Sequence, residues 1–255
     1  MIGLSFLLST AAFAGLTYEG SSTIGENIMP DAVKAFEGKT GIKFDTVGLL
    51  GSGKGFKATV EGKAAIGGLS RTLTPDEKKQ KVYYQIIGYD AIAVYVNAKN
   101  PVKDLSKDQI KGIFTGKIKN WKEVGGPDAP ITVITEIVSA DRATIKEFKE
   151  LAMDGAAYGP TKEIDKPHDC VKGAAADVNA ITYASFSFKE SGVKTIALNK
   201  ADPTPDNVKS GQYLLSRPLI LISKDLPMGD SKKFFEFILS PDGQSIVEKR
   251  FIKVK

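Results

Sequence analysis

The sequence is poor in the residues that build disulfides, metal centres and catalytic triads. Its 255 residues include one cysteine, Cys170, and one histidine, His168. A single cysteine excludes an internal disulfide and a cysteine-rich metal site, and these two donors alone are too few to hold a metal. His168 lies in the polar stretch DKPHDC, where we expect a solvated loop residue. We therefore predict no catalytic residue, no metal and no cofactor.

The chain also lacks blocks of like charge, internal repeats and low-complexity tracts. Its net charge is +5 and its pI about 9.0, but the 35 Lys and Arg residues are spread along the whole length. Trp121 and the other aromatic residues do not alternate with basic ones, so we expect no nucleic-acid partner. A 42% hydrophobic content is ordinary for a globular protein with one large domain or two lobes.

The apolar opening MIGLSFLLSTAAFAG is too short to span a membrane. It ends in Ala12-Phe13-Ala14, the small-x-small pattern that signal peptidase cuts. We interpret residues 1–14 as the end of a secretory signal, which predicts export to the periplasm or cell envelope. The usual basic residues before the apolar run are absent, which leaves a start further upstream open. The alternative is a buried first strand or helix.

Strand-length apolar runs alternate with helical patterns, which predicts an α/β fold with mainly parallel sheets flanked by helices. A helix is expected over residues 23–37 and another over 139–152. Two long apolar strands, near 88–97 and 213–223, would let the chain cross to a second lobe and return. We predict lobe 1 from residues 15–92 with 214–255, and lobe 2 from 93–213.

Three hydroxyl-rich turns each follow a predicted strand and precede a predicted helix. They are 20–23 (GSST), 51–55 (GSGKG) and 139–142 (SADR). Amide groups at a helix start favour an anion, and the carboxyl ends of parallel strands form the usual ligand crevice. Such residues are more often plain helix caps, but three turns in one chain favour an anion site.

The second turn is close to a nucleotide-binding P-loop without completing it. In GLLGSGKG, Gly48, Gly53 and Lys54 fit the pattern, but Gly55 stands where a hydroxyl should hold Mg²⁺. No convincing strand ends in the Asp that would complete a Mg²⁺ site. A nucleotide is therefore a poor second candidate beside a simpler anion. Ser70 and Arg71 follow a further strand, where a guanidinium could serve an oxyanion or form a surface ion pair.

The stretch DLSKDQIKGIFTGKIKNWKEVGGPDAPI makes a family resemblance visible. Together with GSST, GSGKG, IGGLSR, AITYAS and PDGQSIVEK, it resembles the periplasmic phosphate-binding proteins of high-affinity phosphate ABC transporters. The resemblance extends from Gly15 to Lys249. It implies a two-lobed class II periplasmic-binding-protein fold, with phosphate in the cleft between the lobes, that docks on a membrane permease.

The resemblance also implies the ligand-binding residues. Matched by motif, these are Ser22, Thr23, Ser52, Ser70, Arg71 and Ser139, with its neighbours Asp141 and Arg142. The chain departs from the family pattern Arg-x-x-x-Ser-Gly-Thr at Thr135, Ala140 and Asp141, and its tail RFIKVK is also unusual. We hypothesise that Asp141 accepts the proton of hydrogen phosphate and rejects sulfate, against the alternative that it points to solvent.

The function expected from the sequence is capture of inorganic phosphate by a monomer that delivers it to an ABC permease. One alternative is a sensor or binder of another oxyanion, such as molybdate, tungstate or sulfate. A phosphatase of the same fold is a weaker alternative, because no base or metal site is evident.

Overall fold

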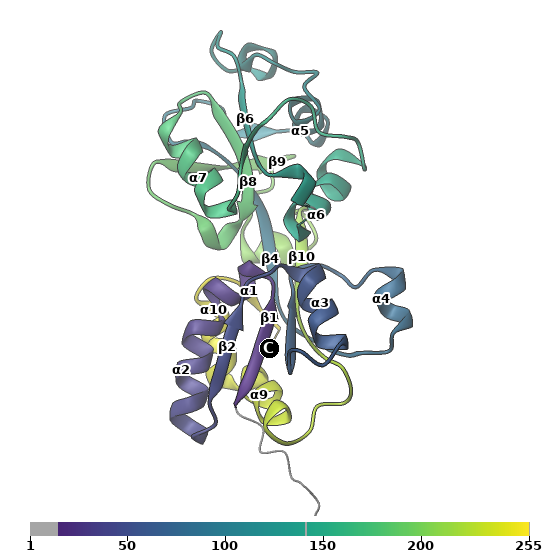
Figure 1. Cartoon of the computed structure of the whole chain (residues 1–255). Coiled ribbons are helices and arrows are strands. Elements are labelled where there is room, and N and C mark those ends of the chain that lie inside the picture. Colours follow the sequence, from purple (N-terminus) through teal and green to yellow (C-terminus); the bar gives the residue numbers. More distant parts are fainter. Residues whose placement is uncertain (1–14, 141, 255) are drawn as a thin grey trace, which may run out of the picture.

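Two long strands connect two lobes (Figure 1), and each lobe contains one of the two largest hydrophobic cores of the described residues. The structure, a computed structural model, describes residues 15–140 and 142–254. Strands β4 (Tyr83–Asn97) and β10 (Ser216–Ser223) are antiparallel neighbours that run between the lobes. One core contains Tyr18 and Phe36, and the other contains Trp121 and Phe148. A two-lobed α/β fold follows from this arrangement.

The first lobe alternates strands and helices and is completed by the C-terminal part of the chain. Its parallel strands pair in the order β2–β1–β3, and β3 pairs antiparallel with β10. The elements are β1 (Leu16–Gly20), α1 (Ser22–Asn27), α2 (Met29–Thr40), β2 (Phe44–Gly48), α3 (Ser52–Val60), β3 (Ile66–Leu69), α4 (Pro75–Lys79), α9 (Gly229–Leu239), α10 (Pro241–Glu248) and β11 (Ile252–Lys253).

The second lobe is formed by the middle of the chain. Strand β6 runs parallel to β7 and β8, while β4 is antiparallel to β8 and β9. The elements are β5 (Asp104–Leu105), α5 (Lys107–Phe114), η1 (Trp121–Val124), β6 (Thr132–Glu136), η2 (Val138–Ala140), α6 (Ala143–Met153), β7 (Lys162–Ile164), α7 (Pro167–Ala176), β8 (Ala180–Ser185), η3 (Phe186–Phe188), β9 (Val193–Leu198) and α8 (Pro205–Lys209).

Local sequence signals fix some helix ends but not others. Ser106 and Gln109, a hydroxyl and an amide residue three positions apart, predict a capping box, and they form one at the start of α5. The single helix expected over residues 23–37 is wrong, because α1 ends at Asn27 and α2 begins at Met29, beside Pro30, which has no N–H to continue the helix. His168 lies in the first turn of α7 and not in a loop.

The C-terminal tail lies across the junction of the two lobes. Ile252 and Lys253 pair antiparallel with Tyr89 and Gly88 of β4. Phe251 belongs to the core of the first lobe, whereas Ile252 belongs to that of the second. The tail therefore packs against both cores through adjacent side chains, although its backbone pairs within the first lobe.

The described residues contain neither a membrane-spanning helix nor a metal-binding cluster. No helix in ranges 15–140 and 142–254 has both the length and the apolar composition needed to cross a bilayer. Over the same residues, His, Cys, Asp and Glu side chains form no group of three that could hold a metal ion. The predicted signal segment, residues 1–14, lies outside the described residues.

Candidate anion-binding site

A small cavity lies between the lobes and receives residues from both. Its accessible volume is about 20 Å³, close to the 10–15 Å³ that one water needs on the same measure, so this arrangement suits a ligand of few atoms. The lobe 1 lining is Ser21, Ser22, Thr23, Gly51, Ser52 and Ser70. The lobe 2 lining is Glu136, Arg142, Ala143, Thr144 and Pro167.

The lobe 1 side is built where strands end and helices begin. Gly51 is the N-cap of α3 and no side chain caps the first amide groups of that helix. Ser52 accepts a hydrogen bond from the Ser70 amide at 3.1 Å, which fixes its hydroxyl beside the end of β3. The uncapped start of this nine-residue helix therefore faces the cavity with its positive dipole end.

Gly55 accounts for the incomplete P-loop pattern. A Cβ at this position would lie 2.6 Å from the Glu19 carbonyl oxygen, because the first turn of α3 packs directly on the backbone of β1. A serine or threonine cannot be accommodated there without moving the helix. The glycine-rich turn therefore serves close packing of α3 against β1 and lacks the hydroxyl that a Mg²⁺-nucleotide site requires.

The helix on the lobe 2 side of the cavity, α6, begins later in the sequence than predicted. Val138–Ala140 form a short 3-10 turn, and α6 starts at Ala143 with Arg142 as N-cap and no side-chain cap. The expectation that Ser139 starts the helix is therefore wrong, and Ala143 and Thr144 take that place at the cavity. Ser139 is exposed and is not among the lining residues. Asp141 lies outside the described residues.

Four buried hydroxyl groups at the cavity share one hydrogen-bonding pattern. Each accepts from a protein N–H: Ser21 from Ile24 at 3.4 Å, Ser52 from Ser70 at 3.1 Å, and Thr23 and Thr144 from the guanidinium of Arg217 at 3.2 and 2.8 Å. None donates to another described residue, so the hydrogens of these hydroxyls remain available. The lining can therefore offer several donors to an anion.

Arg217 lies behind the cavity in a fully buried ion pair with Asp90. The two residues face each other across β10 and β4, and two guanidinium nitrogens donate to Asp90 Oδ2 at 2.9 and 3.0 Å. Ser185 donates to the other carboxylate oxygen at 2.8 Å. Burial raises the pKa of Asp90, although Arg217 and Ser185 oppose the shift. Sequence reasoning missed this pair, although each partner is a charged residue inside an apolar strand.

Glu136 brings an incompletely bonded carboxylate to the cavity. Its Oε1 accepts from Arg142 Nη1 at 3.2 Å, whereas its Oε2 is buried and has no partner among the described residues. The residue is 2% exposed. Burial raises its pKa, and the nearby Arg142 opposes that shift. Arg142 also donates to Asp165 Oδ1 at 2.7 Å, so its charge is shared between two carboxylates.

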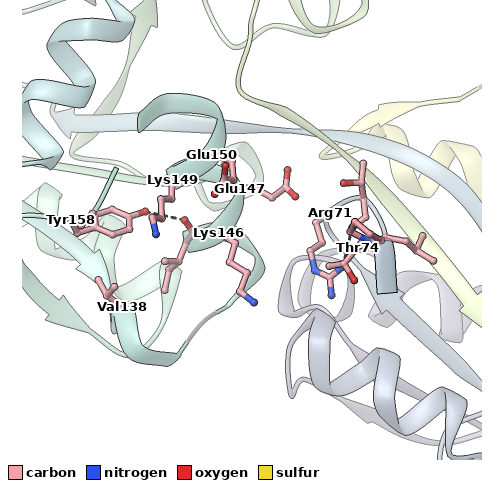
Figure 2. A pocket seen from close by; sticks show the side chains of 13 residues that line it. Arg71, Thr74, Val138, Lys146, Glu147, Lys149, Glu150 and Tyr158 are labelled. Atoms are coloured by element: carbon pink, nitrogen blue, oxygen red, sulfur yellow. Dashed lines mark hydrogen bonds between the residues drawn. The ribbon is translucent and has the colours of Figure 1, made fainter. Parts of the chain in front are cut away.

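Arg71 is not brought to the cavity. Its guanidinium donates to both carboxylate oxygens of Glu77, at 2.6 and 2.7 Å. It lines a separate, wider cleft of about 660 Å³, across which it faces Lys146 and Glu147 of α6 (Figure 2). The physical reason is Glu77, which stands in the third position of α4 as half of its capping box with Thr74 and captures the guanidinium locally.

The predicted ligand residues thus separate into three groups. Those at the cavity are Ser22, Thr23, Ser52, Ser70 and Arg142. Arg71 and Ser139 lie elsewhere, and Asp141 is not described. The residues that sequence reasoning missed are Ser21, Glu136 and Thr144 in the lining, with Arg217 and Asp90 behind it.

Comparison with known proteins places this geometry in a family. The family model for the PBP superfamily domain matches residues 9–242. The phosphate-binding protein PstS of Bacillus subtilis is 34% identical over 246 residues, which cover 92% of this chain and 79% of the relative. That of Staphylococcus epidermidis is 28% identical over 254 residues, covering 92% and 77%.

Solved structures give the same result. A structure from Clostridium perfringens, described as a phosphate ABC transporter substrate-binding protein with bound phosphate, is 35% identical with a TM-score of 0.87, covering 94% of this chain and all of that one. An ABC-type phosphate transport receptor of Vibrio cholerae is 27% identical with a TM-score of 0.80 and the same coverage. The chain therefore belongs to the PBP superfamily and, within it, to the family of bacterial phosphate-binding proteins.

Proposed function

We propose that this protein captures inorganic phosphate in the cavity between its lobes and delivers it to a membrane ABC permease. The observation that carries the proposal is the convergence of four buried hydroxyl donors with the uncapped starts of α3 and α6 on one small cavity. Such donors favour an anion that has lost its water shell. The names of the B. subtilis and C. perfringens relatives support phosphate as that anion.

The strength expected of such a site follows from its donors. A hydrogen bond to a charged group nets roughly 1.5 to 3 kcal/mol. Several of these, after the cost of ordering two lobes around the ligand, support dissociation constants of roughly micromolar or tighter. The proposal includes no covalent step, so it describes a receptor and not an enzyme. We propose that this receptor is a monomer.

The proposal also covers the division of the chain into lobes and its export. Lobe 1 consists of residues 15–92 with 214–255 and lobe 2 of residues 93–213, and closure of the two buries the ligand. The signal-like residues 1–14 support export to the periplasm or cell envelope. A receptor at that location would take phosphate from outside the cytoplasm and present it to the permease.

Glu136 bears on which oxyanion is bound. An ionised carboxylate only accepts hydrogen bonds, and hydrogen phosphate has a proton to donate whereas sulfate at neutral pH has none. The unpartnered Glu136 Oε2 is therefore suited to take the ligand's proton. An ion without a proton would face a buried negative oxygen with no hydrogen bond between them. This gives Glu136 the discriminating role first expected of Asp141.

Calorimetric titration of the exported form tests the proposal. Phosphate should release or absorb heat with a single binding site, and arsenate should bind similarly, whereas sulfate, molybdate and tungstate should bind far more weakly. A Ser52→Ala variant, which removes one lining hydroxyl, should bind phosphate more weakly, by roughly tenfold. No binding of phosphate at millimolar concentration, or tighter binding of tungstate, would contradict the proposal.

A further inference from the structure

Arg217 contacts strand β4 and a cavity hydroxyl from each lobe. From β10 it donates to Asp90 of β4, to Thr23 of α1 in lobe 1 and to Thr144 of α6 in lobe 2. Its side chain is 0% exposed. Arg217 is not among the cavity-lining residues, so a bound ion would meet Thr23 and Thr144 first.

The bonds from Arg217 determine which way the two hydroxyls act. A guanidinium can only donate, so each threonine oxygen uses a lone pair to accept from it. The hydrogen of each hydroxyl must then point elsewhere, and no described residue receives it. Both threonine side chains belong to residues that line the cavity. The cavity is therefore the remaining direction in which the two O–H groups can donate.

Asp90 keeps this arrangement electrically balanced. Two of the guanidinium N–H groups donate to its carboxylate, so Asp90 largely neutralises the positive charge of Arg217. An ion in the cavity therefore meets little net charge from this pair. A planar fork of donors can satisfy the carboxylate and both hydroxyls at once, which a single ammonium on a flexible stem cannot. Arginine therefore contributes the arrangement of its donors at this position and not its charge.

We infer that Arg217 is a positioning residue that sets Thr23 and Thr144 as hydrogen-bond donors toward the bound anion, one from each lobe. The inference rests on the proposed capture of phosphate and adds a specificity rule to it. Two ligand oxygens, those facing Thr23 and Thr144, must be unprotonated, because hydroxyls held as donors cannot accept. A ligand with protons on these oxygens would leave both buried donors without partners.

The test is a set of phosphate titrations with Arg217→Lys and with Thr23→Val and Thr144→Val. Arg217→Lys keeps the positive charge beside Asp90 but loses the fork, and should weaken phosphate binding by at least roughly tenfold. In the Thr23→Val/Thr144→Val background, which has no hydroxyls to orient, the same lysine substitution should change the affinity by less than about twofold. A Thr23→Val/Thr144→Ser background keeps one hydroxyl, so in it Arg217→Lys should again weaken phosphate binding.

The titrations distinguish a positioning role of Arg217 from an effect of its charge or of general stability. If Arg217→Lys lowers phosphate affinity by the same factor in the valine background as in the original protein, Arg217 acts by charge or stability and the inference is overturned. Arg71→Lys is the matched control, since Arg71 is also paired with a carboxylate but lies outside the cavity, and it should leave binding unchanged. If the unaltered protein does not bind phosphate, the proposed function fails and the inference fails with it, whereas binding without coupling overturns the inference alone.

A second variant covers the case in which Arg217→Lys does not fold, as judged by circular dichroism. Asp90→Asn/Arg217→Gln replaces the ion pair by two neutral amides and still leaves the threonines without the fork. This double variant should lower phosphate affinity as much as Arg217→Lys does. In the Thr23→Val/Thr144→Val background it should leave phosphate affinity nearly unchanged. Failure of both variants to fold would overturn the inference in favour of a purely structural role for the pair.

Discussion

Arg71 and Glu77 form a two-point ion pair, in which Nη1 and Nη2 of the arginine lie 2.6 and 2.7 Å from the two carboxylate oxygens. The pair joins the end of β3 to the first turn of α4 and is nearly buried on both sides. Burial acts to raise the pKa of Glu77, but the bonds from Arg71 and Thr74 outweigh it and lower that pKa. This guanidinium is thus occupied by its own lobe.

We therefore predict that Arg71→Ala leaves phosphate affinity within about twofold of the original while lowering the free energy of unfolding by roughly 1 to 3 kcal/mol. Calorimetry and chemical denaturation measure the two quantities. Glu77→Gln breaks the same pair from the other side and should show the same pattern. A large loss of affinity in Arg71→Ala alone would place the guanidinium in the binding site after all.

Gly55→Ser should destabilise the protein, although it completes the P-loop pattern. The new Cβ would lie 2.6 Å from the Glu19 carbonyl oxygen and would force α3 away from β1. We expect a loss of roughly 1 to 3 kcal/mol of stability and weaker phosphate binding, with no gain of ATP binding. Gly53→Ser is the control, because a Cβ there meets nothing within 4 Å. Mg²⁺-ATP binding by Gly55→Ser would refute the packing role assigned to this glycine.

Glu136→Gln should reduce discrimination between phosphate and sulfate. The glutamine keeps the size of the side chain but removes the negative charge and can itself donate, so sulfate no longer meets an unpaired anionic oxygen. We expect phosphate affinity to fall by roughly tenfold and the ratio of phosphate to sulfate affinity to fall by roughly a hundredfold. Competition titrations measure that ratio. An unchanged ratio would remove Glu136 as the discriminating residue.

The same substitution should change the pH dependence of stability in the absence of phosphate. Burial raises the pKa of Glu136 above its ordinary value, so the unfolded chain releases this proton at lower pH than the folded chain does. The contribution of Glu136 is complete below the ordinary pKa of about 4.3 and is lost as pH rises through the folded pKa. Glu136→Gln should therefore gain stability relative to the original protein as pH rises above about 4.

The control for this measurement is Glu123→Gln. Bonds from the Lys119 and Asn120 amides lower the pKa of Glu123, so this glutamate supports the folded state above its ordinary pKa and loses that effect as pH falls. The difference in melting temperature between variant and original should therefore change with pH in the opposite direction. Equal slopes for the two variants would show that desolvation of Glu136 is not responsible.

Local sequence signals predicted the parts of the fold that neighbouring residues decide. A Ser or Thr followed three positions later by Glu or Gln predicts a capping box, and both Thr74–Glu77 and Ser106–Gln109 form one. The start of α6 did not follow its signal, since the chain between β6 and the helix forms a 3-10 turn at Val138–Ala140 instead. Hydroxyls alone do not fix where a helix starts.

The candidate site was predicted only in part, because half of it depends on long-range pairing. Asp90 and Arg217 are 127 positions apart and meet only through the register of β4 with β10. A signal was nevertheless present, since YDAIAVYV and SRPLILI each carry one charge of opposite sign inside an apolar strand. Buried charges need partners, so the two strands could have been matched through these residues.

The tail of the chain links affinity to residues that never meet the ligand. Phe251 and Ile252 are adjacent in sequence but belong to different cores, so their packing depends on the relative position of the two lobes. The observed dissociation constant of such a protein is its intrinsic value divided by the fraction of molecules in the binding-competent arrangement. Where that fraction is small, a tail substitution that shifts this balance by about 1.4 kcal/mol changes the observed affinity about tenfold. Sequence drift at the C-terminus can thus tune the protein to scarce or abundant ligand while every contact in the cavity stays the same.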